Sequence, residues 1–309
     1  MDEWSTERMV TRMKILNFGS LNLDYTYQLP HIVMPGETIT SLDLQVYPGG
    51  KGLNQSVALA KAGADVYHAG LIGADGGLLK ETCEQSGVNV TFLRTSKTRS
   101  GNAIIQVDEN GQNSIILYPG ANRQITREFV DEVLSGFQEG DVLLLQNEIN
   151  ELPYIIDRAY EKGMQIVLNP SPFDAALQSC NMERVSLFLV NEVEGFQMTG
   201  ESEPDQIVRK MQEMYPNAEM VLTLGPKGAL FAGKDGIFSQ PIFPVKAVDT
   251  TGAGDTFTGY FVTAYYERKS PKEALLLAAM ASAIAVTRKG AAVAIPTREE
   301  VEGRLKQLC

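Results

Sequence analysis

Residues 248–262, VDTTGAGDTFTGYFV, place three small residues and a carboxylate where an apolar helix is predicted to begin. Gly252, Ala253 and Gly254 would let an anion approach the unpaired N–H groups of the first helical turn, at the positive end of the helix dipole. Asp255 would then stand beside a bound phosphoryl group, where it could orient an attacking hydroxyl and accept its proton. The segment therefore predicts phosphoryl transfer, although a tightly packed helix start with a favourable first-turn acid shows the same pattern.

Two clusters nearer the N-terminus could hold a polar substrate. Residues 48–63, PGGKGLNQSVALAKAG, set Gly50, Lys51 and Asn54 at the start of a predicted helix, where glycine permits close backbone approach and polar groups can contact hydroxyls. A polar pair, Asn22 and Asp24, lies two residues apart on a predicted strand and projects to one face. A turn with a solvated lysine, and the wet side of a strand, are the simpler interpretations that these clusters leave open.

A further polar cluster follows a strand that is expected to be buried. Residues 187–196, LFLVNEVEGF, end this strand at Asn191, and Glu194 lies in the helix that follows. Asn191 alone is equally well explained as an N-cap. Residues 228–235, GALFAGKD, miss the phosphate-binding pattern GxxxxGK[ST] because Asp235 replaces the hydroxyl residue, so a strand leading into a hairpin is predicted there.

The elements that carry these clusters alternate between short apolar runs and helical segments from Lys14 onward. This is the rhythm of βαβ units on a parallel sheet. The runs in DVLLLQNE, MQIVLNPSP, VSLFLVNEVE and AEMVLTLG predict strands that are buried on both faces. We therefore expect a single doubly wound α/β domain over residues 13–309.

Two stretches with strand periodicity interrupt this rhythm, at residues 22–50 and 98–120. They contain NLDYTYQLP, ETITSLDLQVYPGG and GNAIIQVDENGQNSIILYPG, and Asn110-Gly111 in the last of these is a strong hairpin-turn signal. We expect a small β layer inserted into the core. Additional edge strands of the main sheet are the alternative.

Composition limits the partners and the compartment. Lys and Arg number 27 and Asp and Glu 38, so the net charge of −11 opposes nonspecific binding to nucleic acid or an anionic membrane. Cys83, Cys180 and Cys309 lack the spacing of a disulfide framework or a zinc site, which favours a reducing cytoplasm. Residues 1–12 are expected to form a flexible extension rather than a signal peptide, and no apolar run is long enough to span a membrane. With two histidines in the chain, catalysis would rest on carboxylates and backbone groups.

Taken in order, these clusters resemble the ribokinase family of sugar kinases, also called the PfkB carbohydrate kinases. GGKGLNQSVALAKAG is similar to the family's N-terminal GGKGANQA-type motif, and VDTTGAGDTFTGYF to its C-terminal DTTGAGD motif; the pair is strongly specific. NLD, GGKG, LQNE, NPSP, TLGPKG and AVTRKGA also fall where ribokinases have similar segments. The resemblance runs from Lys14 to the region of Pro296. It implies a Rossmann-like three-layer α/β/α core with a largely parallel sheet, an inserted β-sheet lid, and a homodimer that pairs through this lid.

The resemblance also implies an ATP-dependent kinase that transfers the γ-phosphate to the 5-hydroxyl of D-ribose. In this family pattern, Asp255 matches the catalytic base, and Gly252, Ala253 and Gly254 match the anion hole for the transferring phosphate. The residues that match sugar-binding positions are Asn22, Asp24, Gly50, Lys51, Asn54 and Glu148. Those that match ATP-binding positions are Asn191, Thr223, Gly225, Gly228 and Gly254.

Two cations follow from the same resemblance. Asn191 and Glu194 form the family's NxxE motif, which is associated with magnesium, and this metal would neutralise phosphate charge that an acidic protein otherwise repels. Potassium is implied beside the anion hole. Its ligands would be the side chain of Asp249 and backbone carbonyls at Thr251, Ala285, Arg288 and Gly290.

Several positions depart from the family's pattern. Ala294 stands where ribokinases often have a serine that helps to bind potassium, and Ala279 where some have a histidine against the adenine. Pro226-Lys227 replaces a common Ser-Arg pair, and Leu53 stands where alanine is usual, which would alter the sugar pocket. The substrate could therefore be 2-deoxyribose, another pentose, a hexose or a nucleoside. A sugar-binding regulator without catalysis is a further alternative, against which the intact acid and GAG segment argue.

Overall fold

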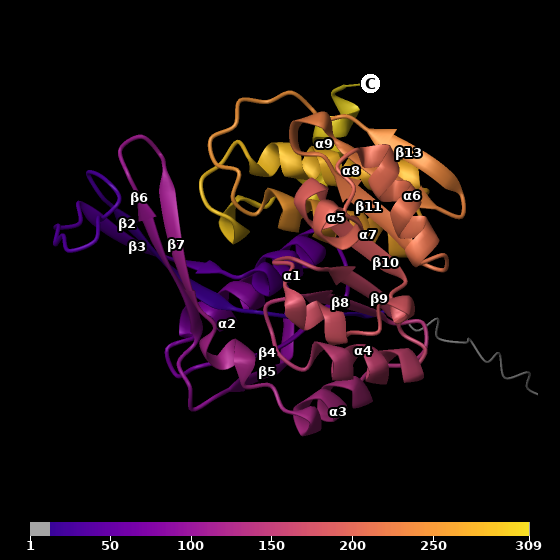
Figure 1. Cartoon of the computed structure of the whole chain (residues 1–309), viewed down its shortest axis with the longest axis horizontal. Coiled ribbons are helices and arrows are strands. Elements are labelled where there is room, and N and C mark those ends of the chain that lie inside the picture. The colour runs from indigo at the N-terminus through magenta and orange to yellow at the C-terminus, as the bar shows by residue number, and fades with distance from the viewer. Residues whose placement is uncertain (1–12, 309) are drawn as a thin grey trace, which may run out of the picture.

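The larger of two sheets organises the core (Figure 1) in a computed structural model that describes residues 13–308. Its strands are β1 (Ile15–Phe18), β4 (Val66–Ile72), β5 (Asn89–Thr95), β8 (Val142–Gln146), β9 (Gln165–Asn169), β10 (Leu187–Asn191), β11 (Glu219–Thr223), β12 (Ala229–Gly233) and β13 (Gly236–Gln240). The nine-stranded order is β13-β12-β11-β10-β9-β8-β1-β4-β5. Strands β11 through β5 in this order run parallel, and β12 and β13 join antiparallel at one edge.

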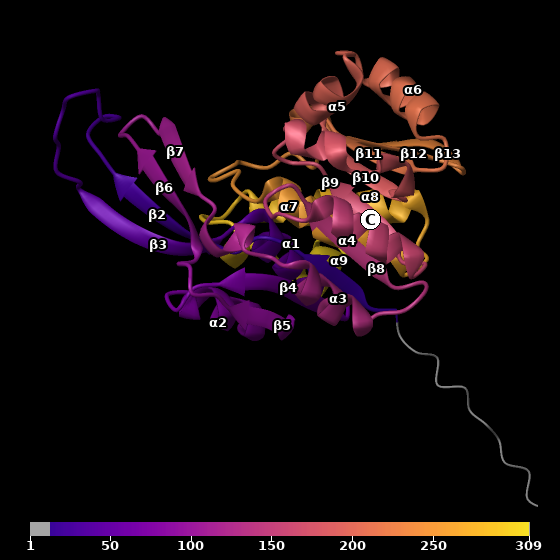
Figure 2. The ribbon, with the colours of Figure 1, turned by 60° about the horizontal axis from the view of Figure 1, so that its bottom comes forward.

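Helices cover both faces of this sheet (Figure 2). One face carries α1 (Lys51–Lys61), α2 (Gly77–Gln85), α7 (Ala253–Tyr266), α8 (Pro271–Ala285) and α9 (Arg298–Lys306). The other carries α3 (Arg127–Ser135), α4 (Leu152–Glu161), α5 (Glu192–Thr199) and α6 (Pro204–Met214). Short 3₁₀ turns lie at Gly120–Arg123, Ala175–Ser179, Met182–Arg184, Gly225–Lys227 and Ala292–Ala294.

Two-sided burial explains why the central strands read as continuous apolar runs. In β8, Val142 and Leu144 enter the hydrophobic cluster of the first face, while Leu143 and Leu145 enter that of the second. Parallel strands covered by helices on both faces need apolar residues at every position. The expected three-layer α/β/α core is confirmed.

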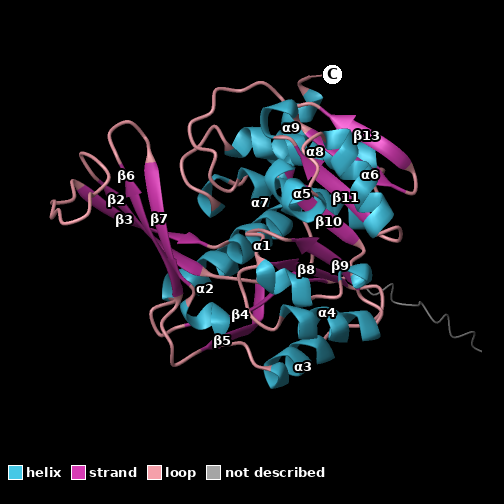
Figure 3. Cartoon of the chain, in the orientation of Figure 1, coloured by secondary structure: helices cyan, strands magenta, loops and turns pink. Residues whose placement is uncertain are grey.

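A separate small sheet extends from one side of the core, as the strands of Figure 3 show. It consists of β2 (Asn22–Gln28), β3 (Asp43–Gly49), β6 (Gly101–Val107) and β7 (Asn113–Tyr118), in the order β3-β2-β6-β7. Strands β6 and β7 form the predicted hairpin, and its turn contains Asn110 and Gly111. The inserted β layer is thus confirmed, and the alternative of extra edge strands is excluded. We call these four strands the β lid.

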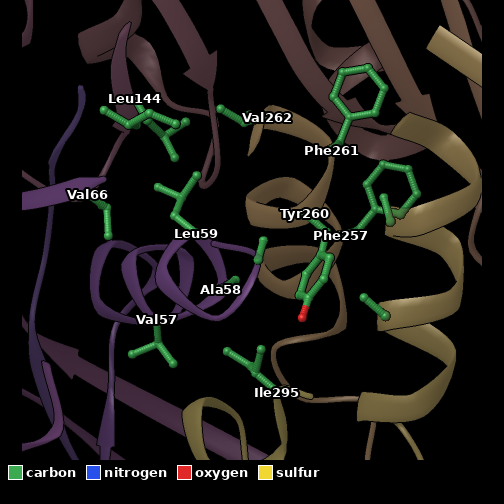
Figure 4. Close-up of a cluster of buried hydrophobic side chains, with 14 of the residues drawn as sticks. Val57, Ala58, Leu59, Val66, Leu144, Phe257, Tyr260, Phe261, Val262 and Ile295 are labelled. Atoms are coloured by element: carbon green, nitrogen blue, oxygen red, sulfur yellow. The ribbon is translucent and has the colours of Figure 1, made fainter. Parts of the chain in front are cut away.

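Helices α1 and α7 pack at close range within the first face (Figure 4). Gly259 of α7 lies so near to Ala58 of α1 that a Cβ atom on the glycine would overlap the alanine side chain. Other buried side chains that Figure 4 labels on these two helices are Val57, Leu59, Phe257, Tyr260, Phe261 and Val262. The close contact fixes the two helices against each other, and the N-terminal turn of each helix carries predicted site residues.

Three smaller predictions concern the hairpin, the membrane and the chain ends. Strands β12 and β13 form the hairpin predicted for residues 228–235, with Gly233 opposite Gly236. Among helices of the described range, none has the length and apolar character needed to cross a membrane. The predictions for residues 1–12 and for Cys309 lie outside the described residues.

Candidate active site

Asp255 lies in the first turn of α7, where Gly252 turns the chain with a φ of 73°. Its side chain is 8% exposed and borders a polar cavity of about 150 Å³. A Cβ atom on Gly254 would meet nothing within 4 Å, so the space before this helix start is open. First-turn N–H groups that face open space form a place where an anion can bind.

The polar cavity gathers residues from well-separated segments. Lys51 comes from α1, Asn169 from the end of β9, Glu194 from α5 and Thr223 from the end of β11. Because β9, β10 and β11 are parallel, their carboxyl ends meet at one edge of the sheet, which is where open α/β sheets bind ligands.

A larger cavity of about 450 Å³ adjoins the polar one. The residues that line both cavities are Asn191, Thr223, Thr250, Ala253 and Gly254. Every predicted ATP-binding residue, including Gly225 and Gly228, lines the larger cavity. Pro226 and Ala279, which differ from the family's pattern, line it as well. Its remaining wall is largely apolar, which suits a flat aromatic base.

The apolar wall contains a segment that the sequence analysis did not assign. Ile242, Phe243, Val245 and Ala247 line the larger cavity from a stretch without regular secondary structure. The sequence signal that could have identified this segment is the run IFPVKA between the predicted hairpin and the GAG motif. This run is largely apolar but lacks the alternation of a strand.

Hydrogen bonds connect the predicted sugar-binding residues with the acid. Asn54 Nδ2 donates to Asp255 Oδ2 at 3.0 Å. Glu148 Oε2 accepts a hydrogen bond from the backbone N–H of Lys51 at 3.1 Å and another from the Ser20 hydroxyl. The start of α1 therefore contacts the acid on one side and Glu148 on the other.

The β lid contributes the remaining predicted sugar residues. Asn22 Oδ1 accepts a hydrogen bond from Asn122 Nδ2 at 2.8 Å, and both asparagines are buried. The carboxylate of Asp24 packs so closely on Gly49 that no Cβ atom would fit there. Gly50 has a φ of 91°, a conformation that favours glycine, and it leads the chain from β3 into α1.

Burial and neighbouring charges shift the pKa values of the polar groups here. Burial, with a smaller contribution from Glu148, raises the pKa of Asp24 to about 7. Burial also raises the pKa of Glu148. For Lys51, burial lowers the pKa, but the carboxylates of Asp255, Glu148 and Glu194 outweigh it and the net shift is upward. Lys51 is thus a cation stabilised by surrounding carboxylates.

Asn191 is an N-cap and also lines both cavities. Its Oδ1 accepts from the backbone N–H of Glu194 at 2.9 Å, and Glu194 Oε2 accepts from the backbone N–H of Asn191 at 3.0 Å. Within residues 13–308, no three His, Cys, Asp or Glu side chains converge on one metal position. A magnesium ion near Glu194 would therefore need water and phosphate oxygens as its other ligands, which this ion accepts readily.

The carboxylate of Asp249 joins the loop before α7 to the loop after α8. Oδ1 accepts from Thr251 N at 2.9 Å and from Thr251 Oγ1 at 2.6 Å, and Oδ2 accepts from Gly290 N at 2.9 Å. Burial alone would raise the pKa of Asp249, but these hydrogen bonds outweigh it and lower the pKa. Ala285 O accepts from Arg288 N at 3.0 Å next to this loop. Carboxylate and backbone carbonyl oxygens are the ligands that hard cations prefer.

Two further residues of the GGKGLNQ segment are fully buried. Gln55 was not assigned to the site, yet its Nε2 donates to Asp255 Oδ1 at 2.9 Å. Its sequence signal is its place directly after Asn54. Leu53 is fully buried in the hydrophobic cluster of α1 and lines neither cavity. Its side chain therefore packs in the core, and its expected effect on the sugar pocket stays a prediction.

The chain is similar to known carbohydrate kinases over most of its length. The sequence model of the pfkB family of carbohydrate kinases matches residues 12–298. A ribokinase from Haemophilus influenzae is 37% identical over 300 residues, which cover 94% of this chain and 97% of that protein. A deoxyribokinase from Salmonella typhi is 31% identical over 300 residues, covering 93% and 97%. The solved structure of Arabidopsis thaliana ribokinase complexed with ribose and ATP has a TM-score of 0.86 at 29% identity, covering 96% of this chain and 99% of that one.

Proposed function

We propose a reaction for this chain from one premise: the chain belongs to the pfkB family of carbohydrate kinases. It transfers the γ-phosphate of ATP to the 5-hydroxyl of D-ribose, giving D-ribose 5-phosphate and ADP. The observation that carries the proposal is the 3.0 Å contact between Asn54 and Asp255, which joins the sugar cluster to the wall of the phosphate cavity. The Haemophilus ribokinase, and the Arabidopsis ribokinase with ribose and ATP, support these two substrates.

The two cavities divide the nucleotide between them. The base of ATP occupies the apolar cavity, and the phosphates cross the shared residues Ala253 and Gly254 into the polar cavity. There the first-turn N–H groups of α7, with Gly252, Ala253 and Gly254, hold the transferring phosphate. Asp255 orients the sugar hydroxyl for in-line attack and takes its proton late, as a loose transition state permits.

The sugar side of the site discriminates by hydroxyl groups. The residues that we propose to contact the sugar are Asn22, Asp24, Gly50, Lys51, Asn54 and Glu148. Polar groups built for particular hydroxyls are left unpaired by a sugar that lacks one, so such a sugar is penalised strongly. The Salmonella deoxyribokinase supports 2-deoxyribose as the second candidate substrate.

Two cations, a compartment and an assembly complete the proposal. Magnesium near Asn191 and Glu194 neutralises phosphate charge when bound, and potassium lies beside the anion hole near Asp249. The other proposed potassium positions are Thr251, Ala285, Arg288 and Gly290. We place the protein in a reducing cytoplasm, because Cys83 and Cys180 are buried free thiols. It forms a homodimer through the β lid.

An ADP-release assay tests the proposal. The purified chain is given ATP and magnesium, with potassium or sodium, and ribose, 2-deoxyribose, fructose or one of several nucleosides. We expect magnesium-dependent turnover that is selective for ribose and higher in potassium. Turnover on 2-deoxyribose alone would keep the chemistry and change the substrate, and absence of turnover on every compound would favour a sugar-binding regulator.

A further inference from the structure

Gln55 holds the carboxylate of Asp255 from within the protein core. It is 0% exposed on α1 and lines neither cavity. Its Nε2 donates to Asp255 Oδ1 at 2.9 Å and to Asn169 Oδ1 at 3.0 Å, which uses both hydrogens of the amide. Asn54 donates to the other carboxylate oxygen, Oδ2, at 3.0 Å. Two successive residues of one helix therefore hold one oxygen each.

The orientation of the Gln55 amide follows from its neighbours. A carboxylate only accepts hydrogen bonds, so Nε2 must face Asp255 and Oε1 must face away. This Oε1 accepts from Gln146 Nε2 at 2.7 Å. Gln146 gives its second hydrogen to Asn17 Oδ1 at 2.9 Å. Because Asn17 lies on β1 and Gln146 on β8, two adjacent strands at the middle of the sheet anchor the Gln55 side chain.

This chain of buried amides costs stability. Asn17, Gln55 and Gln146 are all 0% exposed, yet Gln146 Oε1 and Asn54 Oδ1 have no hydrogen-bond partner. Unsatisfied buried polar atoms are costly, and apolar side chains at the same positions would avoid the cost. The arrangement is therefore better explained by what it does for Asp255 than by what it contributes to the fold.

We propose that Gln55 is a positioning residue for the phosphoryl transfer, an inference that rests on the proposed role of Asp255. Through Gln55 and Gln146, Oδ1 of Asp255 stays tied to the central strands. Oδ2 is then the oxygen that exchanges its partner Asn54 for the 5-hydroxyl of the sugar. The carboxylate plane is thus set before the sugar arrives, and a shift of about 1 Å in such a group can cost on the order of 100-fold in rate.

Two substitutions at Gln55 test the inference. Gln55→Met keeps the length of the side chain but removes the amide. Gln55→Glu keeps the shape and still accepts from Gln146, but it sets a second carboxyl group against Asp255; two such groups at this distance cannot both ionise, so they share a proton and Asp255 is impaired as a base. In both variants we expect kcat to fall about 10- to 100-fold, while the KM values for ribose and ATP change by less than about twofold.

Tyr260→Phe is the matched control. It also removes a buried hydrogen bond from α7, the one that the Tyr260 hydroxyl donates to the Pro296 carbonyl at 2.8 Å, but it does not touch Asp255. We expect a lower melting temperature with unchanged kcat. A loss of kcat in this control equal to that in Gln55→Met would show that general destabilisation explains the effect and would overturn the inference.

A double-mutant cycle with Asp255→Asn supplies the second readout. If Gln55 acts through the carboxylate, Gln55→Met should lower kcat much less in the Asp255→Asn background than in the parent chain. The inference would be overturned if Gln55→Met lowered kcat by the same factor in both backgrounds, or if both Gln55 variants kept a kcat within about twofold of the parent. Either result would leave the proposed function intact. A parent chain that turns over no sugar would overturn the proposed function, and the inference with it.

Discussion

Lys51 is a cation in the lining of a cavity that also contains the carboxylates of Asp255 and Glu194. The protein carries a net charge of −11, so its overall field repels a nucleotide. In the proposed reaction, phosphate binding would therefore depend on local groups: this lysine, the N–H groups at the start of α7, and the proposed metal ions. The upward shift of the Lys51 pKa favours the charged form of this partly buried side chain.

Asp255→Asn is the substitution that tests the proposed catalytic base most directly. The amide keeps the shape of the side chain and can still accept from Gln55, but it cannot take a proton from the sugar. We expect kcat to fall about 100- to 10,000-fold while the dissociation constants for ribose and ATP change little, as steady-state kinetics and calorimetry would measure. Asp235→Asn, at an exposed hairpin position, is the control and should leave kcat unchanged. Near-normal turnover of Asp255→Asn would refute the assigned base.

Asp24 predicts a pH dependence of stability. Its pKa is raised from 3.8 to about 7 in the folded protein, mainly by burial, so the folded state binds this proton more tightly than the unfolded state. The stability that this group contributes is therefore complete below pH 3.8 and is lost as the pH rises towards 7. Between pH 5 and pH 7, the free energy of unfolding of the ligand-free protein should fall by about 2 kcal/mol relative to that of Asp24→Asn.

Denaturant unfolding at several pH values measures this difference. Asp43→Asn, on the neighbouring strand β3 of the β lid, replaces an exposed aspartate and is the control. Its stability should change with pH in parallel with that of the parent chain. Parallel curves for the parent and Asp24→Asn would contradict the prediction.

At the scale of elements, the contact between α1 and α7 should determine both stability and rate. A methyl group at Gly259 would overlap Ala58, and the two helices carry Asn54 and Asp255 at their N-terminal turns. Gly259→Ala should therefore lower the free energy of unfolding by about 1–3 kcal/mol and also lower kcat. Gly303→Ala is the control, because a Cβ atom at this glycine of α9 meets nothing within 4 Å. It should raise stability slightly and leave kcat unchanged; equal effects of both substitutions would contradict the prediction.

Elements with strong local signals could be predicted from the sequence. The apolar runs of β8 to β11 and the Asn110-Gly111 turn specify their structures locally, so the core and the β lid hairpin followed from them. Strand β5 has no such signal. It lies at the sheet edge, is half-buried, and has an irregular register with β4 between Tyr67 and Ala69.

The chain of amides behind Asp255 could not be predicted from the residues alone. Gln55 and Gln146 are 91 residues apart, and Gln146 and Asn17 are 129 apart. Whether these side chains meet depends on how α1 sits over β1 and β8, which is a matter of tertiary packing. Gln55 lies within the family motif, but the motif does not distinguish a residue that contacts a ligand from one that supports such a residue.

At the scale of the whole molecule, the β lid projects away from the core (Figure 1), and its outer strands carry exposed apolar side chains. Strand β7 is an edge of this sheet, and Ile115, Ile116, Leu117 and Tyr118 are 49–58% exposed. At the opposite edge, β3 exposes Leu44 and Val46. A long apolar edge strand that faces solvent invites pairing with another chain unless something covers it. A second β lid presents the same surface, which suits a symmetric dimer.

Ile116→Lys should therefore weaken the proposed homodimer. A charge at this position would be buried without a partner in the paired lids, so we expect the dissociation constant of the dimer to rise at least roughly 30-fold, about 2 kcal/mol. Ile237→Lys is the matched control, because Ile237 is 60% exposed on β13, the edge strand of the main sheet. Light scattering coupled to gel filtration should give the mass of two chains for the parent and the control, and a mass that falls to one chain on dilution for Ile116→Lys. A parent with the mass of one chain, or equal dissociation of both variants, would contradict assembly through the β lid.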